Sequence, residues 1–298
     1  MRVFVTGATE FIGSAIVREL IGAGHRVLGL ARSDKAAGSL TAAGAEVQRG
    51  SLEDLESLRR GTADTDAVIH TAFIHDFNNY GPAVAADGRA IETLGAALAG
   101  SDRRLIVTSG TLLARRQGPL ATENDPADTA YPRKSEDAAH AAERGARVSI
   151  VRLPPSVHGE GDHGFVPALI KVAREKRLSA YVGDGLNRWP AVHRLDAAHL
   201  YRLVLEKGSD GATYHGVTDE GVPARNIAET IGQHLNVPII SKSSEEAASH
   251  FGWIGHFFAI DGPASSAQTR DQLGWRPTQP GLISDLNAEH YFTIERAA

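Results

Sequence analysis

Cysteine is absent from this chain of 298 residues, and long apolar runs are absent as well. Without cysteine there are no disulfides, no thiolate metal ligands and no cysteine nucleophile, and the chain is compatible with a reducing compartment. No stretch approaches the 18 apolar residues of a membrane-spanning helix, and the N-terminus lacks the pattern of a signal peptide. We therefore predict a soluble cytoplasmic protein without membrane contact.

An excess of positive charge is also missing. The chain has 31 Lys and Arg against 36 Asp and Glu, a formal net charge of -5. Proteins that bind nucleic acid usually carry a basic surface, so nucleic acid is not an expected partner. Thirteen histidines are present, but the sequence has no His-Glu-x-x-His pattern and no cysteine to join them, so we predict no metal site.

Apolar runs alternate with helical patterns in the first half of the chain. We predict strands at 3–5, 27–30, 45–47, 67–70, 105–107 and 148–151, and helices at 12–23, 35–43, 52–60, 82–99 and 134–144. This alternation indicates parallel strands joined by right-handed crossovers. The strands are apolar runs because a parallel sheet is buried on both faces. The predicted fold class is α/β, with a doubly wound parallel sheet that binds ligands at the carboxyl ends of its strands.

The second half is less regular. Pro154 and Pro155 end the sixth strand, and the later segments with clear patterns are helices at 196–206 and 226–235 and strands at 213–217 and 237–241. We predict a dinucleotide-binding domain at 1–155. Residues 156–298 would form mainly a smaller substrate-side domain, with about 186–217 returning to the first.

A glycine-rich turn joins the first strand to the first helix. The turn reads Thr6-Gly7-Ala8-Thr9-Glu10-Phe11-Ile12-Gly13. Gly7 allows a sharp turn, Gly13 allows close packing of helix and strand, and the free N–H groups of the helix end attract a pyrophosphate. Glu10 is unexpected here, because its carboxylate would repel phosphates and its backbone would be strained if the position needs glycine. The predicted cofactor-binding residues of this turn are Thr6, Gly7, Thr9, Glu10, Phe11, Ile12 and Gly13.

With this turn, the chain resembles the short-chain dehydrogenase/reductase superfamily, in the extended or atypical branch that includes epimerases and dehydratases. The family fingerprint T-G-x-x-G-x-x-G is matched by Thr6, Gly7 and Gly13, with Glu10 in place of the middle glycine. Residues 108–110, 152–159 and 192–198 match further family segments. The resemblance implies a Rossmann sheet, and it implies that the cofactor is also contacted after the fourth and sixth strands, by Thr71, Ala72, Phe73, Pro154 and Val157.

The end of the second strand predicts the cofactor. An acidic residue there would bind the ribose of NAD, but this chain has Arg32, which can pair with a 2′-phosphate, and Ser33, which adds a hydroxyl. We predict NADP, with NAD less favoured; the alternative is that Arg32 is only a solvated loop charge. Ser51 and Leu52 stand where the family usually has Asp-Leu beside the adenine.

The catalytic motif of the family is not intact. The family uses a tyrosine, a lysine four residues later, and a Ser or Thr near the end of the fifth strand. Here Tyr131 and Lys134 are three residues apart, and Ser109 and Thr111 flank the position where the family has its hydroxyl. These four are the candidate catalytic residues. The alternative is that Tyr131 is a surface tyrosine and Lys134 a solvated charge.

Histidines and aromatic residues near the predicted ligand end of the sheet suggest a substrate pocket. The candidates are His75, His158, His163, Trp189, His193 and Trp253. Such a pocket suits a modest, partly apolar carbonyl compound; the alternative is that the aromatic residues form the core of the smaller domain.

The first hypothesis is NADPH-dependent reduction of a ketone or aldehyde by hydride transfer. The rivals are a sugar-type epimerase or dehydratase and a non-catalytic dinucleotide-sensing protein. By resemblance we also expect a homodimer through helix 82–99 and the helix after Tyr131, helped by small residues at Ala83, Ala86, Ala90, Ala96 and Ala97.

Overall fold

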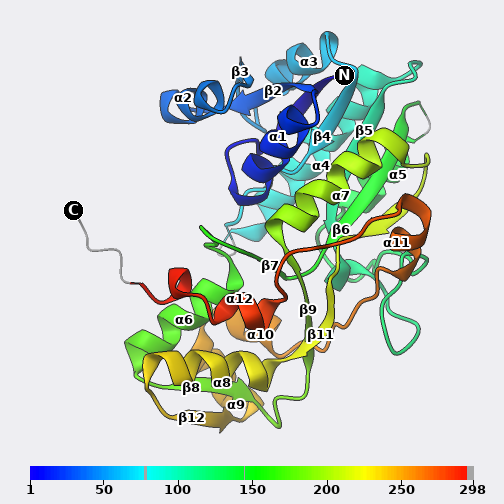
Figure 1. Ribbon diagram of the computed structural model, residues 1–298. Coiled ribbons are helices and arrows are strands. Elements are labelled where there is room, and N and C mark those ends of the chain that lie inside the picture. Colours follow the sequence, from blue (N-terminus) through cyan, green and yellow to red (C-terminus); the bar gives the residue numbers. More distant parts are fainter. Residues whose placement is uncertain (77–78, 144, 294–298) are drawn as a thin grey trace.

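Six strands from the first half and one from the second half form a seven-stranded parallel sheet (Figure 1). A computed structural model describes residues 1–76, 79–143 and 145–293. The strand order is β10-β6-β5-β4-β1-β2-β3. These strands are β1 (Arg2–Thr6), β2 (Arg26–Ala31), β3 (Glu46–Arg49), β4 (Ala67–His70), β5 (Arg104–Gly110), β6 (Arg147–Leu153) and β10 (Thr213–His215). The strand order reverses between β1 and β4, which is where such sheets bind ligands. The predicted fold class is confirmed.

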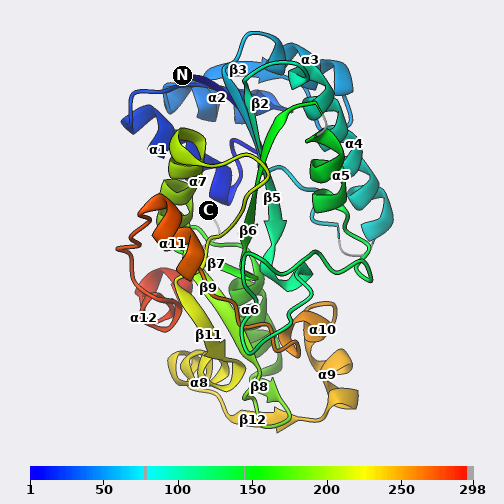
Figure 2. The same cartoon turned by 90° about the vertical axis from the view of Figure 1, so that its right-hand side faces the viewer.

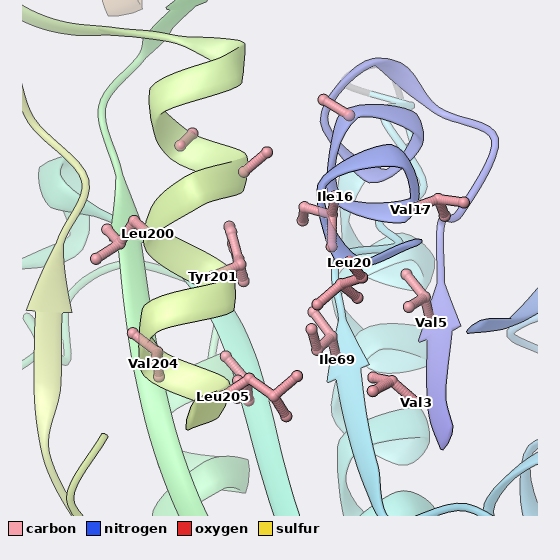
Figure 3. Close-up of a cluster of buried hydrophobic side chains, with 14 of the residues drawn as sticks. Val3, Val5, Ile16, Val17, Leu20, Ile69, Leu200, Tyr201, Val204 and Leu205 are labelled. Atoms are coloured by element: carbon pink, nitrogen blue, oxygen red, sulfur yellow. The ribbon is translucent and has the colours of Figure 1, made fainter. Parts of the chain in front are cut away.

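Helices cover both faces of this sheet. One face carries α1 (Phe11–Gly22), α2 (Asp34–Ala42) and α7 (Arg194–Lys207), whose apolar side chains share one hydrophobic cluster. The other face carries α3 (Leu55–Ala63), α4 (Tyr80–Leu98) and α5 (Ser135–Ala142), which share a second cluster. Figure 3 shows Tyr201 and Leu205 on the side of α7 that faces α1, whose Ile16 and Leu20 belong to the same cluster. Segments almost 200 residues apart therefore close the same face.

A smaller part with its own core lies beside the carboxyl ends of the strands (Figures 1 and 2). A three-stranded sheet, β11-β9-β7, leads into it, and a two-stranded sheet, β12-β8, lies at its far side. These strands are β7 (Ser156–His158), β8 (Ser179–Val182), β9 (Arg188–His193), β11 (Asp219–Pro223) and β12 (Ile239–Lys242). The helices are α6 (Phe165–Lys176), α8 (Ala224–Leu235), α9 (Ser244–Phe251), α10 (Ile254–Phe258) and α12 (Leu282–Leu286), while α11 (Ala267–Leu273) packs near α7.

The segment predicted to return to the large sheet does so only in part. Helix α7 packs on α1, and β10 pairs with β6. Strand β9, however, pairs with β7 and β11 in the three-stranded sheet. The predicted division of the chain near residue 155 stays a prediction.

Of the five small residues expected at a dimer interface, three lie in the core of the single chain, whereas Ala96 is exposed and Ala97 is half-buried. Ala83, Ala86 and Ala90 of α4 are 2%, 3% and 0% exposed within the single chain, where they pack inward. These three are therefore not available to a partner helix, and the homodimer stays a prediction. Within the described residues, we find no helix with the length and apolar character needed to cross a membrane.

Candidate cofactor and active site

The glycine turn after β1 is packed against the segment that follows β4. Gly7 has a φ of +68°, and a Cβ atom there would lie 2.8 Å from both the backbone nitrogen of Ala72 and Oγ1 of Thr71. A Cβ on Gly13 would lie 2.0 Å from the carbonyl oxygen of Gly7. Both positions therefore require glycine, one for its backbone conformation and its neighbours, the other for helix packing.

The backbone strain expected at Glu10 is not found. Glu10 has φ -77° and ψ 173°, an extended conformation that any residue adopts, and its side chain is exposed. It stands at the N-cap of α1, yet its carboxylate caps no N–H group of the helix among the described residues. The first N–H groups of α1 thus remain available to an anion, and only the charge of Glu10 opposes one.

A hollow of about 470 Å³ lies at the carboxyl ends of β2 and β3. Its lining residues are Ala31, Arg32, Arg49, Gly50, Ser51 and Asp54. Arg49, which sequence reasoning missed, forms an ion pair with the exposed Asp34. The carboxylate of Asp54 accepts a bond from the backbone N–H of Ser57 at 3.1 Å and so caps α3. The hollow is thus bordered by the guanidinium groups of Arg32 and Arg49. Its carboxylate, that of Asp54, caps the N-terminus of α3.

The other predicted residues of this region have defined structural roles. The hydroxyl oxygen of Ser33 accepts from the N–H of Ala36 at 3.2 Å and caps α2, which leaves its proton to donate. Ser51 accepts from the N–H of Asp54 at 3.3 Å. Leu52 packs against the second hydrophobic cluster. A polar contact to the cofactor is therefore open to Ser33 and Ser51 rather than to Leu52.

A chain of buried polar side chains leads from the glycine turn to the start of α5. The hydroxyl of Thr6 lies 2.9 Å from Nδ1 of His70, and Nε2 of His70 lies 3.2 Å from Oδ1 of Asp87. Ser135 donates to the other oxygen of Asp87. Burial alone would raise the pKa of Asp87, but the bonds from His70 and Ser135 and the charge of Arg133 hold it below its usual range. Asp87 is therefore a buried carboxylate with a partner for each oxygen.

Arg133 completes this chain at the ligand end of the sheet. Its Nε donates to the hydroxyl of Ser135 at 2.7 Å and lies 3.6 Å from Oδ2 of Asp87. Its Nη2 donates to the carbonyl of Thr108 near the end of β5, at 3.2 Å. The guanidinium carbon stacks 4.2 Å above the ring centre of Phe73. Sequence reasoning missed Arg133, His70 and Asp87; the readable signal was an acidic residue within the apolar face of helix 82–99.

The predicted tyrosine and lysine precede the helix rather than share its face. Helix α5 begins at Ser135, so Tyr131 and Lys134 both lie in the segment before it. Lys134 donates to the carbonyl of Thr129 at 2.7 Å, approaches Asp137 to 4.0 Å, and is 40% exposed. Tyr131 is partly buried, and its hydroxyl has no hydrogen-bond partner among the described residues. The geometry therefore does not pair these two side chains.

The two hydroxyls predicted at the end of β5 differ in their surroundings. Ser109 is buried and donates to Oε1 of Glu136 at 2.6 Å. That carboxylate also accepts two bonds from Arg152, at 2.8 and 2.7 Å. Thr111 is 2% exposed, and its Oγ1 has no hydrogen-bond partner within the described part of the chain. The hydroxyl of Ser109 thus already donates to a buried ion pair, whereas the hydroxyl of Thr111 could still bind a ligand.

The predicted histidines fall into two groups. His163 contacts the ring of Phe11 edge-on, with the ring centres 5.7 Å apart, so the loop before α6 lies against the glycine turn. His75 lies near the same place. Its pKa is lowered because surrounding protein desolvates its ring and because Arg133 adds positive charge, while Glu10 opposes this shift. These two histidines border the candidate cofactor site.

The second group is buried where the smaller part joins the sheet. His158 and His193 are opposite each other in the β7–β9 pair. His158 is fully buried and hydrogen-bonded through Nδ1 to Asp285 at 2.8 Å. His193 accepts from the N–H of Leu195 at 3.2 Å, and burial lowers its pKa. Nearby, Pro154 is buried and Val157 packs against the first cluster. Contact of His158 with a substrate would require this junction to open.

The aromatic residues of the second half divide between core and surface. Trp189 is 0% exposed and donates to the carbonyl of Phe257 at 3.2 Å, so it is a core residue and not a wall of an open pocket. Trp253 is 44% exposed and meets the ring of Phe165 edge-on, at 5.5 Å. Phe165 follows His163 by two residues, which brings this aromatic group close to the glycine turn. The alternative of a core role holds for Trp189.

Comparison with known proteins agrees with this architecture. A family model described as the NAD dependent epimerase/dehydratase family matches residues 3–217. An uncharacterized protein of Schizosaccharomyces pombe is 50% identical over 98% of this chain and 100% of its own length. A 4-hydroxy-2-methyl-3-oxo-4-farnesyl-3,4-dihydroquinoline-1-oxide ketoreductase of Stigmatella aurantiaca is 27% identical, over 85% of this chain and 80% of the relative.

Among solved structures, a dTDP-glucose 4,6-dehydratase from Streptomyces venezuelae, determined with NAD bound, is similar in fold. The TM-score is 0.77 with 22% identity, and the match covers 96% of this chain and 94% of the dehydratase. At this identity the likeness extends to the fold alone.

Proposed function

The chain belongs to the NAD-dependent epimerase/dehydratase family, and from this membership we propose that it is an NADPH-dependent reductase of a ketone or an aldehyde. NADPH, when bound, supplies the hydride that reduces the carbonyl carbon. The protein's own groups bind the cofactor, orient the carbonyl and stabilise the charge that develops on its oxygen.

The glycine turn supports the cofactor part of this proposal. At Gly7 and Gly13 a Cβ atom would collide with backbone or side-chain atoms, so glycine at both positions lets the turn pack tightly between α1 and the segment after β4. The first N–H groups of α1 have no side-chain cap among the described residues. Such a helix end binds a pyrophosphate without a charged side chain.

The hollow at the ends of β2 and β3 carries the choice of NADPH over NADH. Arg32 and Arg49 both border it, and a guanidinium pairs well with the 2′-phosphate that only NADPH has. Ala31 stands at the end of β2, where an acidic residue would favour NADH. Ser51 also lines the hollow, and Ser33 directly follows Arg32, so both hydroxyls could add polar contacts to the 2′-phosphate end of the cofactor.

The substrate class rests on the residues around the carboxyl ends of β4 and β5 and on one relative. Phe73, Phe165 and Trp253 offer apolar surface near the turn, and His75 and His163 offer polar contacts. The relative from Stigmatella aurantiaca is named as a ketoreductase. Both observations support a partly apolar carbonyl compound. An epimerase or dehydratase would instead want a Tyr/Lys pair, which Tyr131 and Lys134 do not form.

A direct titration with NADPH and NADH tests this proposal. We expect NADPH to bind at least tenfold more tightly than NADH, and Arg32→Ala and Arg49→Ala to reduce that ratio by about tenfold each, from loss of one charge-assisted bond. Arg26→Ala is the matched control, because Arg26 is an exposed arginine at the opposite end of β2. Equal binding of the two cofactors would refute the preference for NADPH.

Turnover is tested separately. With NADPH bound, a panel of ketones and aldehydes is followed by loss of absorbance at the cofactor's wavelength. Tight binding without oxidation of NADPH by any carbonyl compound would favour the non-catalytic, dinucleotide-sensing alternative. We further propose a cytoplasmic homodimer; sedimentation at equilibrium tests the dimer directly.

A further inference from the structure

One largely buried cation near the ends of β4 and β5 has no role in binding the adenosine half of the cofactor. Arg133 is 17% exposed and belongs to the segment that follows β5 and precedes α5. It is stacked on Phe73, three residues after the end of β4, and donates to the carbonyl of Thr108, near the end of β5.

The path of the cofactor in the proposed function indicates which part of it lies near Arg133. The 2′-phosphate end lies at the β2–β3 hollow and the pyrophosphate at the start of α1. In a doubly wound sheet the rest of the ligand then extends across the point where the strand order reverses, toward β4 and β5. Arg133 stands on that side. The nicotinamide half and the carbonyl substrate therefore meet its guanidinium.

The side chain of Arg133 is held in place by its neighbours, but not all of its N–H donors are used. Its Nε donates to Ser135, which in turn donates to Asp87, and Asp87 is held on its other side by His70. A guanidinium has five N–H donors. Two are used by Ser135 and Thr108, which leaves three without an acceptor in the portion of the chain that the structure describes. A largely buried cation with spare donors and a rigid support is well suited to stabilise a developing negative charge.

The neighbouring lysine lacks these properties. Lys134 is 40% exposed and donates to Thr129 in the loop before the helix. Among the described residues, Lys134 forms no hydrogen bond with Thr6, His70, Asp87 or Ser135, the buried polar side chains that support Arg133. The two adjacent cations thus differ in burial, support and direction, which makes them a matched pair for an experiment.

We propose that Arg133, and not Lys134, is the cationic catalytic residue: its guanidinium binds the nicotinamide riboside of the cofactor and stabilises the alkoxide formed from the carbonyl. This rests on the proposed reductase function. When bound, NADPH would supply a hydride to the carbonyl carbon and be left as NADP⁺. The electron pair of the broken C=O π bond moves to oxygen, and a proton from water completes the alcohol.

The first test is a binding measurement that needs no turnover. NADPH is compared with adenosine 2′,5′-bisphosphate, which has the 2′-phosphate half of the cofactor but no nicotinamide riboside. We expect Arg133→Met to weaken NADPH by about tenfold, as for loss of a charge-assisted hydrogen bond, and the bisphosphate by less than twofold. Lys134→Met should change neither, and Arg133→Lys should restore part of the loss. Thermal unfolding of each variant confirms that it is folded.

The second test is kinetic. With a substrate found in the carbonyl panel, Arg133→Met should lower kcat by about 100-fold, the usual loss when one oxyanion donor is removed, with a smaller change in KM, and Lys134→Met should keep kcat within twofold. Equal weakening of both ligands by Arg133→Met, or a larger loss in Lys134→Met, would overturn the assignment while leaving the reductase proposal intact. If the unaltered protein binds neither ligand, the proposed function fails and this assignment fails with it.

Discussion

Replacing Glu136 by glutamine is expected to cost more stability than any exposed charge substitution in this chain. Glu136 and Arg152 are 4% and 2% exposed, and two hydrogen bonds of 2.8 and 2.7 Å join them. Ser109 of β5 also donates to the carboxylate of Glu136, at 2.6 Å. The three side chains thus join α5, β6 and β5. Glutamine keeps the shape but removes the charge, so the guanidinium of Arg152 remains buried without a counter-ion.

Removal of one partner from a buried pair costs about 3–5 kcal/mol. A domain has a total unfolding free energy of about 5–15 kcal/mol, so Glu136→Gln would remove a large share of it. The matched control is Glu229→Gln. Glu229 pairs with Arg225 at 2.8 Å, but these side chains are 38% and 51% exposed, and such a pair contributes about 0–1 kcal/mol. Urea unfolding at pH 7, followed by circular dichroism, gives both values. A difference below 1 kcal/mol between the two variants would refute the reasoning.

The dependence on pH supplies a second check on the same pair. Burial by itself would raise the pKa of Glu136, but the hydrogen bonds and the charge of Arg152 outweigh it and hold the pKa below its ordinary 4.5. A carboxyl with a lowered pKa stabilises the fold above its unfolded pKa, and this stabilisation is lost as pH falls through the folded pKa. The difference in unfolding free energy between the original protein and the Glu136→Gln variant should therefore become smaller only below about pH 4.5.

Three further substitutions test other features. Glu10→Gly should tighten NADPH about fivefold, because a charge about 4 Å from a phosphate costs roughly 1 kcal/mol in water; an unchanged Kd in the titration would show that the carboxylate points away from the phosphates. Thr111→Val should leave the unfolding free energy in urea unchanged or raise it by up to about 1 kcal/mol, since a buried hydroxyl without a partner is costly; a clear loss would reveal an unseen bond. Asp285→Asn should cost about 1–3 kcal/mol at pH 7 by weakening the bond to the buried His158; thermal melts of equal midpoint would contradict this.

The first half of the fold was predictable because its strands are buried on both faces. Runs such as 3–5 and 67–69 are wholly apolar and buried, and no surface requirement interrupts them. In the second half, the same reasoning failed at β9. Pro190 lies within that strand and reads as a breaker, but the pairing with β11 is irregular between Asp219 and Val222, opposite this proline. The irregularity removes the need for an N–H at that position.

Helix α6 was missed for a different reason. It begins directly after the glycine-rich loop and carries Pro167 in its first turn, where a proline costs no helical hydrogen bond. The candidate site was predictable at its glycine turn, because the turn is local in the sequence. Arg133 and Asp87 were not, because they are 46 positions apart and only the packing of α4 against α5 brings them together.

The order in which the large sheet acquires its parts has a consequence during synthesis. Strand β6 ends at Leu153, but α7 and β10, which cover one face and pair with its edge, end only at Lys207 and His215. At 5–20 residues per second, the ribosome needs roughly 3–12 s to supply them. For that time the outer edge of β6 has no strand beside it, and an open edge of this kind recruits other chains. The nascent protein is therefore an expected client of ribosome-associated chaperones, and its aggregation risk lies in that interval rather than in the finished molecule.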